Sequence, residues 1–392
     1  MDFKDFLSNK LKSIEKANWK RNLIIQKPID SIRRIVHFVE GFDSVDKEII
    51  QFSSNDYLGL SQDPRLIEAA LEACKEYGFG ATGSRLITGT SALHIQFEEK
   101  LAEFKSTEKA LFFSSGYAAN VGTISALVGK QDLILSDELN HSSILSGAKL
   151  SGAELIEYEH LSIDSLEQKL IEYRKDYKNA LICTESVFSM DGDIADLKSI
   201  VEIAEKHDAW LLVDEAHSTG VFGGEGRGLV YKLGLTDKVH VQMGTCSKAL
   251  GVEGGYIAGS TELIDFLIQR AKTFVYSTAP SIPAIAALME SLKICQAENW
   301  RREKLFKNVQ LIRAFCSAQG LELIEGQSQI ICLKMPSNEI ALKWSGKLME
   351  LGVWVQAIRP PTVKTPRLRI SVSALHDESN LKQLFEALNT FL

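Results

Sequence analysis

The segment ADLKSIVEIAEKHDAWLLVDEAH, which runs from Ala195 to His217, contains the unit that decides the fold. Residues 195–208 carry apolar side chains at helical spacing, and the continuous apolar run of residues 210–213 follows directly. Such a run is typical of a strand that is covered on both faces, as strands are in parallel sheets flanked by helices. The segment therefore predicts a helix followed by a buried strand.

The same alternation recurs through the middle of the chain and predicts an α/β fold. Seven short apolar runs are each followed by polar residues or glycine, and they lie at residues 110–116, 132–141, 154–160, 179–186, 209–217, 239–248 and 254–260. Helical patterns separate several of them, which predicts an open, mostly parallel seven-stranded sheet flanked by helices. Because ligands bind at the carboxyl ends of such strands, the residues just after each run are the first candidates for a site.

The pattern changes after residue 280 and predicts a smaller α+β domain. A long helical stretch at 284–320 is followed by three apolar runs and a final amphipathic helix at 377–392, for which Asp377 is the expected N-cap. We therefore divide the chain into an N-terminal helix and segment (1–50), a large domain (51–285) and a small C-terminal domain (286–392). In the first part, Phe3, Phe6, Leu7, Leu11 and Ile14 have helical spacing and predict a docked amphipathic helix.

The composition of the chain limits the kinds of partner that we expect it to have. The formal net charge is −7 and the lysines and arginines form no stripe, so nucleic acid is not an expected partner. No apolar run approaches the length of a membrane span, and the N-terminus has no apolar signal region, so we expect a cytoplasmic protein. The six cysteines have no CxxC pair or metal-ligand spacing, so we expect reduced, buried thiols and no metal.

A carboxylate and a histidine follow the strand at 210–213. Asp214 stands where this strand ends, and a buried carboxylate there is costly unless a cation or a hydrogen-bond donor meets it. His217 lies three residues further on. Two other interpretations of the motif are a turn-capping aspartate and the DEAH box of an ATPase. The ATPase interpretation requires a GxxxxGK[ST] phosphate loop, which the sequence lacks.

Two further strand ends carry polar groups. In FFSSGYAAN (112–120), a strand leads through Ser115 and Gly116 into a helix, and the free N–H groups of a helix start can bind phosphate. His141 follows the strand within 132–141, where a lone histidine can equally be a structural residue.

Lys248 lies in the turn GTCSKALG (244–251), which supplies the hydroxyl groups of Thr245 and Ser247. A lysine that attacks a carbonyl must be neutral, although a phosphate-binding lysine would also suit this turn. Pyridoxal 5'-phosphate needs a lysine that forms an imine, a carboxylate for its pyridine nitrogen and a phosphate cradle. Lys248, Asp214 and the residues after the strand at 110–113 together match these three needs.

The chain resembles the α-oxoamine synthases, which belong to the fold-type I pyridoxal phosphate enzymes. The resemblance covers almost the whole chain, through motifs at 52–61, 83–104, 136–144, 185–193, 213–223, 245–251, 276–280 and 367–376. It implies the fold-type I transferase fold and a homodimer with active sites at the subunit interface.

The resemblance also implies roles for individual residues. Lys248 would form the imine, Asp214 would pair with the pyridine nitrogen and His141 would stack on the ring. The remaining cofactor contacts would come from His217, Ser189, Ser115, Gly116, Tyr117, Thr245 and Ser247, with Thr278 contributed by the second subunit. Asn55 and Arg369 would bind the amino-acid substrate, and the planar fork of Arg369 suits a carboxylate.

One stretch of the sequence indicates which reaction of the family the chain would catalyse. VWVQAIRPPTV (353–363) is similar to the branch of the family that acts in biotin biosynthesis, and Arg21 and Arg359 lie where that branch has arginines. This implies decarboxylative condensation of L-alanine with a pimeloyl thioester of coenzyme A or an acyl carrier protein. The loop at 362–369 is shorter than in that branch. A relative that uses glycine or serine, such as a glycine C-acetyltransferase or a serine palmitoyltransferase, is the alternative.

Overall fold

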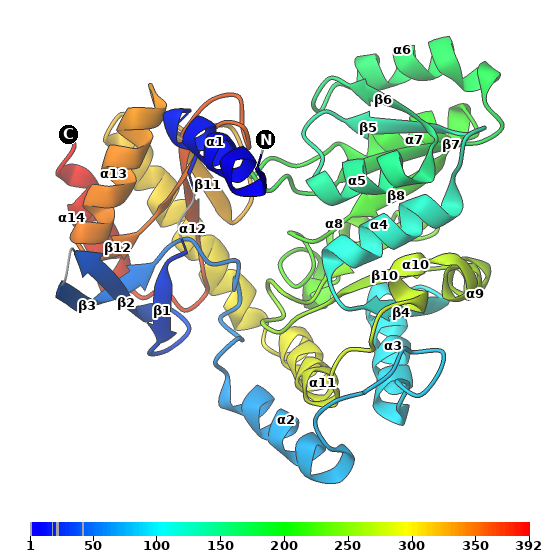
Figure 1. The fold of residues 1–392 in the computed structure, drawn as a ribbon, viewed down its shortest axis with the longest axis horizontal. Helices are drawn as coiled ribbons and strands as arrows, with labels where there is room; N and C mark the ends of the chain where they lie inside the picture. The colour runs from blue at the N-terminus through cyan, green and yellow to red at the C-terminus, as the bar shows by residue number, and fades with distance from the viewer. Residues whose placement is uncertain (1, 18, 21–22, 41–42) are drawn as a thin grey trace.

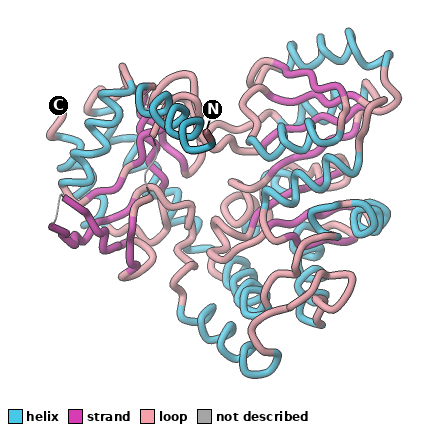
Figure 2. Tube along the Cα trace, in the orientation of Figure 1, coloured by secondary structure: helices cyan, strands magenta, loops and turns pink. Residues whose placement is uncertain are grey.

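The computed structural model describes residues 2–17, 19–20, 23–40 and 43–392 (Figure 1). One body of the structure contains the large sheet with helices on both sides, and a second body contains the C-terminal elements together with the N-terminal strands (Figures 1 and 2). The described helices include none that is long and apolar enough to cross a membrane.

The large sheet confirms the predicted α/β fold. It has seven strands in the order β4-β10-β9-β8-β7-β5-β6, and only β10 runs antiparallel to its neighbours. Each strand coincides with one of the seven apolar runs: β4 (Lys109–Phe113), β5 (Leu133–Asp137), β6 (Glu154–Tyr158), β7 (Ala180–Glu185), β8 (Trp210–Asp214), β9 (Val241–Thr245) and β10 (Gly255–Gly259). The carboxyl ends of the six parallel strands therefore share one edge.

Helices cover both faces of this sheet, which explains the continuous apolar runs. Leu212 of β8 belongs to one core, with residues of helices α4, α5 and α9, whereas Leu211 and Val213 face a second core with residues of α3, α6 and α7. Successive side chains of a strand point to opposite faces, so both sets must be apolar. The helices of this part are α3 (Ala92–Lys105), α4 (Gly116–Leu127), α5 (Ser142–Ser151), α6 (Ile163–Tyr173), α7 (Leu197–Lys206), α8 (Leu229–Lys232), α9 (Thr261–Arg270) and α10 (Lys272–Val275).

The C-terminal part contains an antiparallel sheet in the order β11-β14-β13. Its elements are β11 (Ile330–Lys334), α13 (Asn338–Glu350), β13 (Gln356–Ile358), β14 (Arg367–Ser371) and α14 (Glu378–Asn389). Asp377 caps α14 as predicted, since its Oδ1 accepts from the backbone N–H of Asn380 at 2.8 Å. The long helical stretch is two helices, α11 (Ile282–Ala297) and α12 (Asn299–Ala318), because the backbone at Glu298 leaves the helical region.

The N-terminal segment forms strands that the sequence patterns did not predict. A second sheet has the order β1-β2-β3-β12 and comprises β1 (Ile25–Pro28), β2 (Arg33–Glu40), β3 (Asp43–Gln51) and β12 (Val353–Trp354). The parallel pairing of β3 with β12 ties this segment to the C-terminal part. Helix α2 (Pro64–Tyr77) then packs against α11.

The predicted N-terminal helix forms as α1 (Phe3–Lys16), but the prediction that it is docked is wrong for the single chain. None of its residues is buried, and its five large apolar side chains are 39–72% exposed. Amphipathic spacing predicts a helix with an apolar face, but it does not say that another part of the same chain covers that face.

The cysteines match the prediction of free, buried thiols. All six are free, and five of them are buried, whereas Cys74 is half-buried. Burial raises the pKa of the Cys246 thiol, so this residue is a poor nucleophile despite its position two residues before Lys248.

Candidate active site

The polar ends of β7, β8 and β9 meet the N-termini of α4 and α5 around a cavity of about 240 Å³. Nine residues that the sequence analysis singled out line this cavity: Ser115, Gly116, Tyr117, His141, Asp214, His217, Thr245, Ser247 and Lys248. The structure thus brings together the groups that follow the strands, because these strands are parallel and share one edge.

Asp214 is the last residue of β8 and is buried. Its Oδ2 accepts from Asn120 Nδ2 at 2.8 Å, and its Oδ1 accepts from the backbone N–H of Ala216, also at 2.8 Å. Asn120 in turn donates to Ser143 Oγ at 2.9 Å, which fixes the amide. Two donors therefore hold the carboxylate in place at the cavity wall, where it can accept a further hydrogen bond.

Lys248 lies in the turn between β9 and β10. The backbone N–H of Gly251 donates to the Lys248 carbonyl at 2.9 Å, and Gly251 has a φ of +71°. A Cβ at Gly251 would lie 2.6 Å from the backbone nitrogen of Ser61, so only glycine fits this turn. Burial lowers the pKa of Lys248 to about 8, although the nearby Asp214 and Glu185 act in the opposite direction. Near neutral pH, the neutral fraction of this amine is therefore much larger than that of an ordinary lysine.

His217 connects Lys248 to a chain of polar groups. Its Nε2 lies 2.8 Å from Lys248 Nζ, and its Nδ1 lies 2.7 Å from the hydroxyl of Tyr57. Burial holds the pKa of His217 well below its ordinary value, and the positive charges of Lys248 and Arg369 add to this effect. The ring is therefore neutral. Since the Tyr57 hydroxyl donates to Asn55 Oδ1 at 3.0 Å, the ring proton belongs on Nδ1, and Nε2 accepts from Lys248.

The same chain of hydrogen bonds reaches the arginine that we expect to bind a carboxylate. Arg369 of β14 donates through Nη2 to Asn55 Oδ1 at 3.2 Å, through Nε to the carbonyl of Ser189 at 2.7 Å and through Nη1 to Ser371 Oγ at 2.7 Å. Three acceptors from three separate segments therefore fix the plane of the guanidinium.

The N-terminus of α4 forms one end of the cavity. Ser115 caps this helix through Oγ, which accepts from the backbone N–H of Ala118 at 3.0 Å. Beside the start of the helix, where a Cβ at Gly116 would lie 3.5 Å from Thr245 Oγ1, the hydroxyl oxygens of Thr245 and Ser247 lie 2.8 Å apart. A Cβ at Gly255 would lie 2.5 Å from the Cα of Gly116, so a glycine at 255 lets β10 approach the helix start. Helix N–H groups together with hydroxyl groups are suited to bind a phosphate.

Sequence reasoning missed two groups beside His141. The backbone N–H of His141 donates to Glu185 Oε1 at 2.7 Å, and its ring Nδ1 lies 2.7 Å from Ser143 Oγ. Burial, together with the charge of Asp214, raises the pKa of Glu185 well above its ordinary value. Glu185 ends β7, so the rule that placed Asp214 at the site also applied to it.

The other predicted residues that the structure describes lie outside the lining of this cavity. Ser189 contributes its carbonyl to Arg369, and Thr278 is exposed and forms an isolated β-bridge with Ser84. Arg359 follows β13 and donates to the carbonyl of Lys20 at 3.1 Å. Arg21 lies outside the described residues.

The residues present fit pyridoxal phosphate. Lys248 supplies the amine, and the buried Asp214 supplies a carboxylate acceptor, held by Asn120. The start of α4, with Thr245 and Ser247, offers N–H and hydroxyl groups that could hold the phosphate. These are the three groups that this cofactor demands of a protein.

A model of the family described as Aminotransferase class I and II matches residues 47–388, so the chain belongs to this family. A relative from Trichodesmium erythraeum, named "Putative 8-amino-7-oxononanoate synthase", is 47% identical over 98% of this chain and 97% of its own length. This finding confirms the resemblance that the sequence motifs indicate.

Solved structures share the fold. A variant of serine palmitoyltransferase from S. paucimobilis, with bound PLP–myriocin aldimine, has a TM-score of 0.91 and 29% identity, and the match covers 98% of this chain and 96% of that chain. An 8-amino-7-oxononanoate synthase from Francisella tularensis has a TM-score of 0.76 and 32% identity, over 88% of this chain and 97% of that chain.

Proposed function

We propose that the chain is a pyridoxal phosphate-dependent acyltransferase that joins L-alanine to a pimeloyl thioester. The products would be 8-amino-7-oxononanoate, CO2 and the free thiol carrier, which is a step of biotin biosynthesis. The observation that carries the proposal is that the Lys248 amine and the Asp214 carboxylate line one cavity. The full-length similarity to relatives that carry the name of this synthase supports the choice of reaction.

When bound, pyridoxal phosphate supplies an electron sink for negative charge at the α-carbon of the amino acid. Asp214 would keep the pyridine nitrogen protonated, since Asn120 and the N–H of Ala216 hold its carboxylate at the cavity wall. Lys248 would hold the cofactor covalently at rest and then, once displaced by alanine, remove the proton from Cα. A pKa of about 8 suits a base that works near neutral pH.

The neighbouring residues would position the groups that react. His141 would lie against the cofactor ring, since its backbone and its ring are both fixed at the cavity wall. His217 would donate to the cofactor's oxygen from Nε2 once Lys248 has moved away. This needs the other ring tautomer, and the Tyr57 hydroxyl can support it by donating to Nδ1.

Substrate carboxylates would be bound by arginines. Arg369 would clamp the carboxylate of alanine together with Asn55, because Arg369 is already oriented by the contacts described above. Arg359, together with Arg21, would meet the distal carboxylate of the pimeloyl chain. The thioester would be carried on coenzyme A or on an acyl carrier protein.

The active enzyme would be a cytoplasmic homodimer. The uncovered apolar face of α1 and the exposure of Thr278 support a partner subunit, to whose active site Thr278 would contribute.

A serine- or glycine-using enzyme is the second candidate, and the similarity to serine palmitoyltransferase favours it. Purified holoenzyme is incubated with alanine, glycine or serine and with acyl thioesters of equal length, with and without a terminal carboxylate. Preference for alanine and for the dicarboxylic donor supports the proposal. Preference for serine or glycine, or indifference to the terminal carboxylate, contradicts it.

A further inference from the structure

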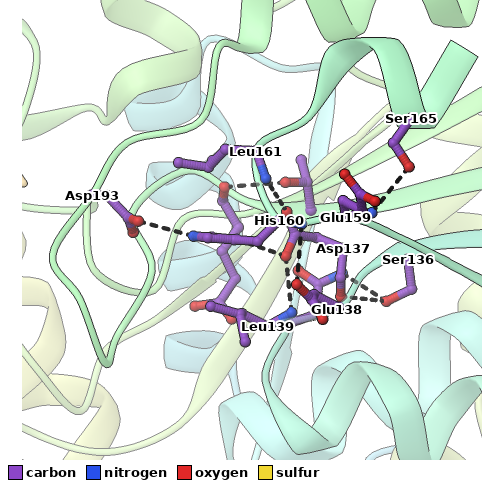
Figure 3. Close-up of polar contacts among 12 residues, drawn as sticks. Ser136, Asp137, Glu138, Leu139, Glu159, His160, Leu161, Ser165 and Asp193 are labelled. Atoms are coloured by element: carbon purple, nitrogen blue, oxygen red, sulfur yellow. Dashed lines mark hydrogen bonds and ion pairs between the residues drawn. The ribbon is translucent and has the colours of Figure 1, made fainter. Parts of the chain in front are cut away.

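His160 lies between two carboxylates (Figure 3), and it is not one of the residues that line the cavity. Its Nδ1 is 2.8 Å from Asp137 Oδ1, and its Nε2 is 2.9 Å from Asp193 Oδ2. Asp137 ends β5, His160 follows β6 and Asp193 belongs to the loop after β7. The ring therefore ties together the ends of three neighbouring strands.

Since an ionised carboxylate can only accept hydrogen bonds, contacts of both ring nitrogens of His160 with carboxylate oxygens favour the charged imidazolium form of the ring. Burial opposes the charge, but the hydrogen bonds and charges of Asp137 and Asp193 outweigh it and raise the pKa of His160 to about 9. The Asp137 side chain is 1% exposed and that of Asp193 is 15% exposed. Without the cation between them, two poorly solvated negative charges would face each other.

Asp193 depends on this contact. Its Oδ1 is buried and has no hydrogen-bond partner among the described residues, so His160 is what compensates the carboxylate. Phe188, from the same loop, packs edge-on against the His160 ring with centroids 4.6 Å apart. The loop is thus held to His160 by charge at one point and by an aromatic contact at another.

Asp193 closes a tight turn formed by residues 187–194. Its carbonyl accepts from the backbone N–H of Phe188 at 3.1 Å, and Val187 and Ile194 form a β-bridge. Gly192 has a φ of +79°, and a Cβ there would lie 2.4 Å from the carbonyl oxygen of Ile330. These contacts hold the backbone of the turn in one conformation.

This turn carries the carbonyl of Ser189, which accepts from Arg369 Nε at 2.7 Å. Arg367 holds the same turn through Asp191 and through the carbonyl of Met190. The turn therefore supplies one of the three acceptors that orient the Arg369 guanidinium, and a shift of the turn would disturb this contact.

We propose that His160 is a positioning residue for the substrate-carboxylate site, because it holds the 187–194 turn whose Ser189 carbonyl orients Arg369. The inference rests on the proposed function, in which Arg369 binds the carboxylate of alanine. His160 itself would touch neither substrate nor cofactor.

The test compares His160→Gln with the wild-type holoenzyme in the absence of thioester. The dissociation constants of L-alanine and of ethylamine, which is alanine without its carboxylate, are measured from the change in cofactor absorbance. Loss of charge-assisted hydrogen bonds predicts that alanine binds about 10-fold to 100-fold more weakly to the variant. Ethylamine binding should change by less than about twofold, since it makes no contact with Arg369.

A matched control is His207→Gln. The His207 side chain is 15% exposed, against 18% for His160. His207 directly follows α7, and its ring lies beside the carboxylate of Glu167. This control should bind both ligands as the wild type does. If His160→Gln does not fold, Asp193→Asn replaces it, because this change also removes the charged contact and should weaken alanine selectively.

Unchanged alanine affinity in these variants, or equal weakening of alanine and ethylamine, would overturn the inference. Failure of the wild-type holoenzyme to bind alanine more tightly than ethylamine would instead refute the proposed role of Arg369.

Discussion

Lys248 Nζ lies 2.8 Å from Nε2 of His217, and this contact begins a hydrogen-bonded chain that runs through Tyr57 and Asn55 to Arg369. The amine comes from the turn after β9 and the guanidinium comes from β14, so two separate parts of the chain meet here. These hydrogen bonds connect Lys248, which would move a proton, to Arg369, which would bind the substrate carboxylate.

Tyr57→Phe tests this series of hydrogen bonds. The change leaves Nδ1 of the buried His217 without its partner, and an unsatisfied buried polar group costs about 1–3 kcal/mol. We expect the free energy of unfolding, measured in urea, to fall by that amount. Tyr276→Phe is the control, since Tyr276 is 81% exposed and the change should stay within about 0.5 kcal/mol. Equal effects of the two changes on the free energy of unfolding would show that these hydrogen bonds do not stabilise the fold.

Asp214→Asn tests the carboxylate. An amide cannot keep the pyridine nitrogen charged, so exchange of the alanine Cα hydrogen in deuterated water should slow by several orders of magnitude, as expected when a main source of transition-state stabilisation is lost. Proton NMR of alanine with the holoenzyme measures the rate. The exposed Asp164→Asn should exchange as the wild type does. Near-normal exchange in Asp214→Asn would refute the role of Asp214.

Gly255→Ala tests the phosphate cradle. The added methyl group would lie 2.5 Å from the Cα of Gly116 and must push β10 away from the start of α4. We expect weaker binding of pyridoxal phosphate, measured by fluorescence titration. Gly346→Ala on α13 meets no atom within 4 Å, and it should leave cofactor binding unchanged while stabilising the helix by about 0.5–1 kcal/mol. Unchanged cofactor affinity in Gly255→Ala would contradict the proposal that the start of α4 binds the cofactor phosphate.

His160 predicts a pH dependence of stability. Its pKa rises from an ordinary 6.5 to about 9 in the fold, so its charged contacts stabilise the protein fully below pH 6.5. This contribution is lost as the pH rises through 9. The difference in unfolding free energy between the wild type and His160→Gln, measured in urea, should therefore shrink over this range. A difference that is constant with pH would show that the ring is not charged.

Much of the fold and the cofactor site could be predicted from local patterns. The seven runs became strands because both faces of the sheet are covered, which requires continuous apolar sequence. Asp214 and Lys248 could be placed at one site because parallel strands end at one edge.

Other features depend on contacts between distant segments. Asn120 lies one helical turn inside α4, and Tyr57 comes from a loop far from the sheet in sequence, so no strand-end rule pointed to them. The pairing of β3 with β12 joins residues some 300 positions apart. The division of the chain at residues 50 and 285 stays a prediction, as do the roles of Arg21, Arg359 and Thr278.

The central claim is that pyridoxal phosphate is attached to Lys248. Holoenzyme is reduced with borohydride, digested and examined by mass spectrometry. We predict that the mass of the reduced cofactor is found on the peptide containing Lys248, and that Lys248→Ala has neither this adduct nor turnover. Attachment to a different lysine, or full activity of Lys248→Ala, would contradict the account.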